Sequence, residues 1–142
     1  MITSILLFIF LTAGTFFDLR KRSVPLILYI LFGIAGIPLC LLLKDPAALW
    51  DQLLGLLPGL VFIGISLISD GKLGMGDSLA ILITGIYLGG SGSAFAVLTA
   101  MFITSVFSVI LLVSKKGSKK TELPFMPFLL SGFIIQQIGA RI

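Results

Sequence analysis

The sequence predicts an all-α, polytopic membrane protein with six transmembrane helices and extracytoplasmic N- and C-termini. Two observations predict this class. Hydrophobic residues make up 58% of the 142 residues and charged residues only 11%, whereas a soluble domain has about 25% charged residues. The charged and turn-forming residues are also confined to short stretches between long apolar segments. We therefore expect a single six-helix domain over residues 1–142, embedded in a lipid bilayer.

Six apolar segments are candidate spans, because about 20 helical residues cross about 30 Å of hydrocarbon. The first and the fourth are short, so their ends are expected near a thinned or wetted part of the bilayer. Four small residues, 89–92, separate the fourth and fifth segments; they favour a tight turn over a break in one long helix. The expected spans are Ile2–Phe17, Val24–Leu43, Leu53–Ser69, Asp77–Gly90, Ala94–Val113 and Pro124–Ala140.

The distribution of basic residues predicts the orientation of these spans. Lysine and arginine are enriched in short cytoplasmic loops. Eight of the ten basic residues lie in the first, third and fifth loops, and only Lys44 and Arg141 lie on the other side. We therefore expect these three loops to be cytoplasmic. The eight are Arg20, Lys21, Arg22, Lys72, Lys115, Lys116, Lys119 and Lys120.

Two pairs of glycines have the spacing that lets membrane helices approach closely. These pairs are Gly55 with Gly59 on the third span and Gly85 with Gly89 on the fourth. Small residues four apart are common where helices pack in lipid. We expect them to serve packing and no chemistry.

The residue counts limit the chemistry of the chain. A single cysteine, Cys40, and no histidine exclude a disulfide framework, a Cys/His zinc site and a Ser–His–Asp site. Gly71-Lys72 is followed by Leu73, where a phosphate-binding loop needs Ser or Thr. The net charge of +4 is spread over loops, so no nucleic acid is expected as a partner. No metal and no cofactor is expected either.

Three acidic residues, Asp18, Asp70 and Asp77, fall on the expected cytoplasmic side. Asp77 ends the string Gly74-Met75-Gly76-Asp77, whose glycines permit close backbone approach. The acid then begins a helix, where the helix dipole favours negative charge. An acid beside an apolar span is a candidate for function. Composition alone favours ordinary roles, with Asp77 capping a helix and Asp18 marking a helix end.

A pair of aspartates can hydrolyse a peptide without a metal or a histidine. Two carboxylates in contact do not both ionise readily, so they titrate as a coupled pair that shares a proton. The ionised member takes a proton from water, which attacks a peptide carbonyl carbon. The protonated member donates to the carbonyl oxygen. Asp18 and Asp77 could form such a pair if the first and fourth spans are neighbours.

Three short segments, in order, resemble the motifs of the type IV prepilin peptidases and the archaeal preflagellin peptidases, which are membrane aspartyl proteases of the GxGD type. The first is Asp18-Leu19-Arg20-Lys21-Arg22-Ser23-Val24-Pro25, similar to the D-x-R-x-x-x-(I/V)-P of that family. The second is Gly74-Met75-Gly76-Asp77, and the third is Leu123-Pro124-Phe125-Met126-Pro127-Phe128. The resemblance extends over nearly the whole chain and includes the six-helix layout.

This resemblance implies an aspartic-type endopeptidase in the plasma membrane of a prokaryote, with Asp18 and Asp77 as the catalytic pair. It implies that the enzyme cleaves the basic leader of prepilin-like precursors at the cytoplasmic face, in service of a type IV pilus or a related secretion system. Gly74, Met75, Gly76, Arg20 and Pro25 would support the site. Residues that would line it are Pro124, Phe125 and Pro127.

The chain departs from the family pattern in its first cytoplasmic loop. Many members have a long loop with two Cys-x-x-Cys pairs linked to methylation of the new N-terminus, whereas this loop is short and has no cysteine. The chain is thus expected to be a short form without zinc and without methyltransferase activity. Leu26 and Leu79 also replace residues that the family often has as Asn and Lys, which affects the expected choice of substrate.

Two other functions are compatible with the sequence. The first is a small transporter in which Asp18 and Asp77 bind a cation or relay protons; its acids would lie mid-span and recur in an inverted repeat. The second is a pilus assembly factor that binds pilin helices without cleaving them. The oligomeric state is left open. Asp70 is the one rival to the expected pair, although it lies outside all three motif segments.

Overall fold

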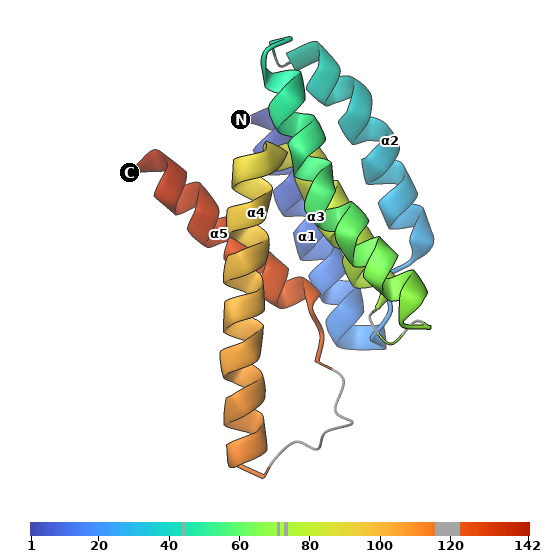
Figure 1. Cartoon of the computed structure of the whole chain (residues 1–142), viewed down its shortest axis with the longest axis vertical. Coiled ribbons are helices and arrows are strands. Elements are labelled where there is room, and N and C mark those ends of the chain that lie inside the picture. The colour runs from blue at the N-terminus through green and yellow to red at the C-terminus, as the bar shows by residue number, and fades with distance from the viewer. Residues whose placement is uncertain (44, 71, 73, 116–122) are drawn as a thin grey trace.

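The computed structural model describes residues 1–43, 45–70, 72, 74–115 and 123–142. These residues form five α-helices and no strand, so the all-α prediction is confirmed for them (Figure 1). Of the basic residues used above for orientation, Lys44, Lys116, Lys119 and Lys120 lie outside the described residues. The helices are α1 (Ile2–Lys21), α2 (Leu26–Leu43), α3 (Ala48–Ile68), α4 (Met75–Val113) and α5 (Met126–Arg141).

The surface of the helices indicates a membrane protein. α1, α2, α3 and α4 are each long and apolar enough to cross a membrane, and α5 is shorter, with 16 residues. Large apolar side chains point outward along the helices; Leu42 is 83%, Ile68 86% and Phe102 71% exposed. Water solvates so large an apolar surface poorly, whereas lipid chains solvate it well. The count of six spans and their orientation stay predictions.

α4 covers both the fourth and the fifth expected spans, and it consists of two helical halves that meet at a kink at Gly89, within the turn expected over 89–92. One residue, Gly89, interrupts the helical backbone, with φ 82° and ψ −174°. A residue with a side chain rarely adopts this conformation, and glycine does so at little cost. One such residue is enough to redirect the chain, which is why Gly90 and Ser91 remain helical.

The two halves of α4 run in opposite directions on either side of Gly89 (Figure 1). Asp77, near the start of the first half, lines a cavity together with Phe125, next to the start of α5. Phe107, far along the second half, has its ring centroid 5.4 Å from that of Phe128. The chain therefore leaves this end of the molecule in the first half of α4 and returns to it in the second.

Several helices begin or end away from the bounds of the expected spans, because the polarity of a residue marks the edge of the apolar layer and does not stop a helix. α1 continues past Phe17 to Lys21, and α3 begins at Ala48 rather than Leu53. α2 begins at Leu26 rather than Val24, because Pro25 favours an extended conformation in the residue before it. Asp18 consequently lies inside the last turn of α1.

The expected glycine pairs lie between α3 and α4. A Cβ on Gly85 would collide with the carbonyl oxygen of Gly55, and one on Gly59 would collide with the backbone of Leu82. Ser93 Oγ also donates to the Gly55 carbonyl oxygen at 3.4 Å. Gly55, Gly59 and Gly85 therefore have the predicted packing role, because they let α3 and α4 approach closely.

Replacing Gly55 by Ala is expected to destabilise the fold by about 1–3 kcal/mol, the usual cost of overpacking. Its Cβ would contact the backbone of Gly85 and Gly89, so the helices must separate. Gly64→Ala, on the same helix, is the matched control, because a Cβ at Gly64 meets nothing within 4 Å. Thermal unfolding in detergent measures both variants. Equal stability of the two would contradict this account of the interface.

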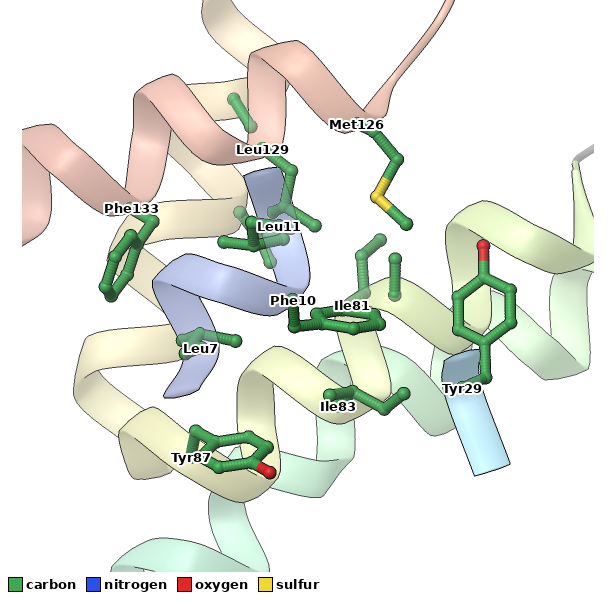
Figure 2. Close-up of a cluster of buried hydrophobic side chains, with 13 residues drawn as sticks. Leu7, Phe10, Leu11, Tyr29, Ile81, Ile83, Tyr87, Met126, Leu129 and Phe133 are labelled. Atoms are coloured by element: carbon green, nitrogen blue, oxygen red, sulfur yellow. The ribbon is translucent and has the colours of Figure 1, made fainter. Parts of the chain in front are cut away.

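A buried cluster where α1, α2, α4 and α5 meet holds the helix ends in place (Figure 2). Phe10 of α1 lies at its centre, with its ring 5.9 Å from that of Tyr29 and 5.2 Å from that of Phe32. The cluster packs α1 against α2, α4 and α5, and Val24 of the first motif segment packs against it. Its large members are Leu7, Phe10, Leu11, Tyr29, Ile81, Ile83, Tyr87, Met126, Leu129 and Phe133.

Candidate functional site

A cavity of about 540 Å³ lies at the end of the molecule where α1 ends and α4 begins. This is the end at which the α1–α2 and α3–α4 connections lie, and both chain termini lie toward the opposite end (Figure 1). All three motif segments contribute to the cavity. Its lining residues are Asp18, Arg22, Ser23, Val24, Tyr29, Lys72, Gly74, Gly76, Asp77, Leu123, Pro124 and Phe125.

Asp18 is held in the last turn of α1 and joins that helix to α5. The helix ends at Arg22, which adopts a left-handed conformation with φ 54° and donates its N–H to the Asp18 carbonyl oxygen. The side chain is half-buried, and its Oδ2 accepts a hydrogen bond of 3.2 Å from the backbone N–H of Met126. Asp18 therefore fixes the start of α5 beside the cavity.

Asp77 lies in the first turn of α4, third after the capping residue Gly74. Its half-buried carboxylate points back toward Gly74: a Cβ on Gly74 would lie only 3.1 Å from Asp77 Oδ2. The helix dipole favours a negative charge at this position. The carboxylate makes no hydrogen bond with any residue that the structure describes, so its oxygens remain available to a molecule in the cavity.

The second glycine of the GxGD string makes room for a tyrosine. A Cβ on Gly76 would lie 3.2 Å from the hydroxyl oxygen of Tyr29. The two carboxylates interact electrostatically with each other, and the Tyr29 hydroxyl interacts with both. Two acids and one phenol are thus gathered from α1, α4 and α2.

Two cations also line the cavity. Arg22 follows α1 and Lys72 precedes α4, and both side chains are exposed. They add positive charge to the lining that holds the two carboxylates. The apolar part of the lining comes from Val24, Leu123 and Phe125, so the cavity offers polar and apolar contacts together.

Six of the residues expected to form the site line the cavity, and four do not. Met75 is exposed, and Arg20 points elsewhere, with its guanidinium carbon 5.7 Å from the centre of the Phe16 ring. Pro25 and Pro127 are absent from the lining. Arg20, Pro25 and Met75 were expected to support the site and Pro127 to line it. Neighbours along the chain point to different faces of a helix, so the members of one motif need not all line the cavity. The six are Asp18, Gly74, Gly76, Asp77, Pro124 and Phe125.

The rival acid Asp70 lies outside the cavity. It is exposed, with φ 53°, in the turn that follows α3. Sequence reasoning in turn missed Tyr29, Arg22 and Lys72 as members of the lining. A tyrosine in an otherwise apolar span, four residues after Pro25, was the signal that could have identified Tyr29.

Comparison of the chain with models of protein families, with curated proteins and with solved structures finds no match. The class of protein is therefore inferred from the cavity and from the three motif segments.

Proposed function

We propose that this protein is a membrane-embedded aspartyl endopeptidase, similar to the type IV prepilin peptidases, that removes the basic leader of prepilin-like precursors. One observation carries the proposal. Two aspartates from α1 and α4, far apart along the chain, line one cavity together with residues of the third motif segment. An ordinary helix-capping role would not require the three segments to meet.

The reaction uses water and the two carboxyl groups. The ionised aspartate removes a proton from water, and the water oxygen bonds to the scissile carbonyl carbon. The protonated aspartate gives its proton to the carbonyl oxygen, which produces a tetrahedral diol. In the second step the C–N bond breaks, one diol proton returns to a carboxylate, and the amine nitrogen takes a proton from the other carboxyl group. The dyad then again holds one proton.

The size and lining of the cavity are suited to a peptide segment. Its volume of about 540 Å³ lies within the range of about 300–1,000 Å³ that is usual for ligand sites. The apolar side chains beside the acids would receive small or apolar side chains of the substrate. The exposed mouth would admit the water that the reaction consumes.

A cytoplasmic position of this cavity forms part of the proposal. Four basic residues lie at its end of the molecule, in the last turn of α1 and in the connections that follow α1 and α3. They are Arg20, Lys21, Arg22 and Lys72. Basic residues concentrate on the cytoplasmic side of membrane proteins. A leader that has not crossed the membrane would therefore reach the acids directly.

A cleavage assay tests the function. The purified protein in lipid vesicles is mixed with a panel of single-span precursors, each with a basic leader that ends in glycine. We expect mass spectrometry to find a cut after that glycine and an unmethylated new N-terminus. The proposal would be overturned if every precursor remained intact, although the enzyme is folded and a known prepilin peptidase cuts one of the same precursors.

A further inference from the structure

Tyr29 is held rigidly at the edge of the buried cluster. It is 7% exposed, and its ring meets the ring of the fully buried Phe10 edge-on, with centroids 5.9 Å apart. Figure 2 shows the hydroxyl at the end of the ring that points away from Ile83. Packing on the ring thus fixes where the hydroxyl lies.

Tyr29 lines the cavity, and its hydroxyl lies beside Gly76, another lining residue. Tyr29 belongs to the lining together with Asp18 and Asp77, and it interacts electrostatically with both acids. It makes no hydrogen bond with any other residue in the described part of the chain. A buried tyrosine hydroxyl usually has such a partner, so this one is available to a molecule in the cavity.

We propose that the Tyr29 hydroxyl is a catalytic hydrogen-bond donor that stabilises the negative charge developing on the scissile carbonyl oxygen. This role rests on the proposed peptidase function. As the water oxygen bonds to the carbonyl carbon, Tyr29 donates a second hydrogen bond to the oxygen that the protonated aspartate also approaches. The phenol keeps its proton, so the proton balance of the reaction is unchanged.

The other side-chain donors of the lining are less suited to this task. Arg22, Ser23 and Lys72 are exposed, and water weakens the hydrogen bonds of exposed groups. The nearby N–H of Met126 is already bound to Asp18. A donor fixed in advance by packing avoids the reorganisation that a mobile side chain would need, which is the basis of oxyanion stabilisation.

The same geometry assigns a purpose to Gly76. A methyl group there would lie 3.2 Å from the Tyr29 hydroxyl oxygen, closer than a comfortable contact. Gly76→Ala would therefore push the hydroxyl away from its place beside the acids. Gly76 acts as a positioning residue for Tyr29 in this account.

Steady-state cleavage by Tyr29→Phe tests the proposal. Loss of one oxyanion donor lowers kcat by about 10²–10³-fold, and we expect that fall with little change in KM. Tyr87→Phe is the matched control, since Tyr87 is the other tyrosine of the chain. Its hydroxyl is bound at 2.8 Å to the Phe32 carbonyl oxygen, away from the cavity, so its kcat should stay near wild type.

A double-mutant cycle separates a chemical role from a structural one. Gly76→Ala alone should lower kcat, whereas Gly76→Ala added to Tyr29→Phe should lower it little further, because the group it displaces is already gone. Additive effects would show that Gly76 does not act through Tyr29. Thermal unfolding of each variant confirms that the compared proteins are folded.

The outcomes distinguish this proposal from the function on which it rests. If wild type cleaves, Asp77→Asn does not and Tyr29→Phe keeps kcat within about threefold of wild type, only the role of Tyr29 is overturned, since a lost donor costs far more. If Asp77→Asn cleaves as well as wild type, the aspartyl mechanism is overturned and the role of Tyr29 with it.

Discussion

Asp77→Asn is expected to lower kcat/KM for leader cleavage by about 10⁴-fold, the upper end of what general acid–base catalysis contributes. An amide is close to a carboxyl in shape but neither accepts a proton from water nor donates one at neutral pH. The side chain forms no hydrogen bond that the fold uses within the described residues, so the variant should insert and fold normally. Steady-state cleavage rates measure the loss, and thermal unfolding checks the fold.

Asp70→Asn is the matched control for this variant. Asp70 is exposed in the turn after α3 and outside the cavity, yet it lies only seven residues before Asp77. Its replacement removes the same charge from nearby and should leave cleavage near wild type. If Asp70→Asn lost as much activity as Asp77→Asn, the loss would come from removing a negative charge near the cavity rather than from removing a catalytic carboxyl group.

Substitution of Asp18 is expected to have the second large effect on cleavage, and Asp18→Asn and Asp18→Ala should differ in their effect on fold stability. Asp18→Asn should lower kcat/KM about as much as Asp77→Asn, because both members of the pair are required. The amide oxygen can still accept the N–H of Met126, so α5 should stay docked. Asp18→Ala removes that acceptor and leaves a backbone N–H unpaired at a residue that is 1% exposed. An unpaired buried donor costs about 1–3 kcal/mol.

Cleavage rates and thermal unfolding together check this second prediction. Both variants should be inactive, while only Asp18→Ala should unfold at a clearly lower temperature than wild type. Two results would refute it: substantial cleavage by Asp18→Asn, or identical unfolding temperatures for the Asn and Ala variants. The first would remove Asp18 from the reaction, and the second would remove its role in placing α5.

The fold class was predictable because it depends on composition along the chain. Long apolar stretches separated by charges indicate membrane helices whatever their tertiary arrangement, and the structure confirms the helices themselves. The reversal within α4 was predictable from the small residues 89–92, but the residue that makes it was not, because it depends on the backbone angles of Gly89. Nothing in a run of four small residues indicates which of them leaves the helical conformation.

The sequence predicted the site residues that belong to a motif with recognisable chemistry. It did not predict the residues that reach the site through packing between helices. Asp18 and Asp77 stand out as acids beside apolar spans, and both line the cavity. Tyr29 is different, because its place depends on contact between α2 and the first turn of α4, and only the structure reveals that contact. Gly76 appears in the sequence as part of a string, whereas its contact with Tyr29 explains why a side chain there is excluded.

Chemical cross-linking of positions 18 and 77 tests most directly whether the two acids meet at one cavity. The single cysteine, Cys40, is replaced by Ala, and Asp18→Cys is combined with Asp77→Cys in membranes treated with a short thiol-reactive cross-linker. The control pairs Asp77→Cys with Asp51→Cys. Asp51 Oδ1 lies 3.1 Å from the Cβ position of Gly90. Gly90 is more than about 15 Å from Asp77 along α4, at 1.5 Å per residue. We predict a cross-link for the first pair only; its absence in folded protein, or an equal yield for both pairs, would contradict a shared aspartate site.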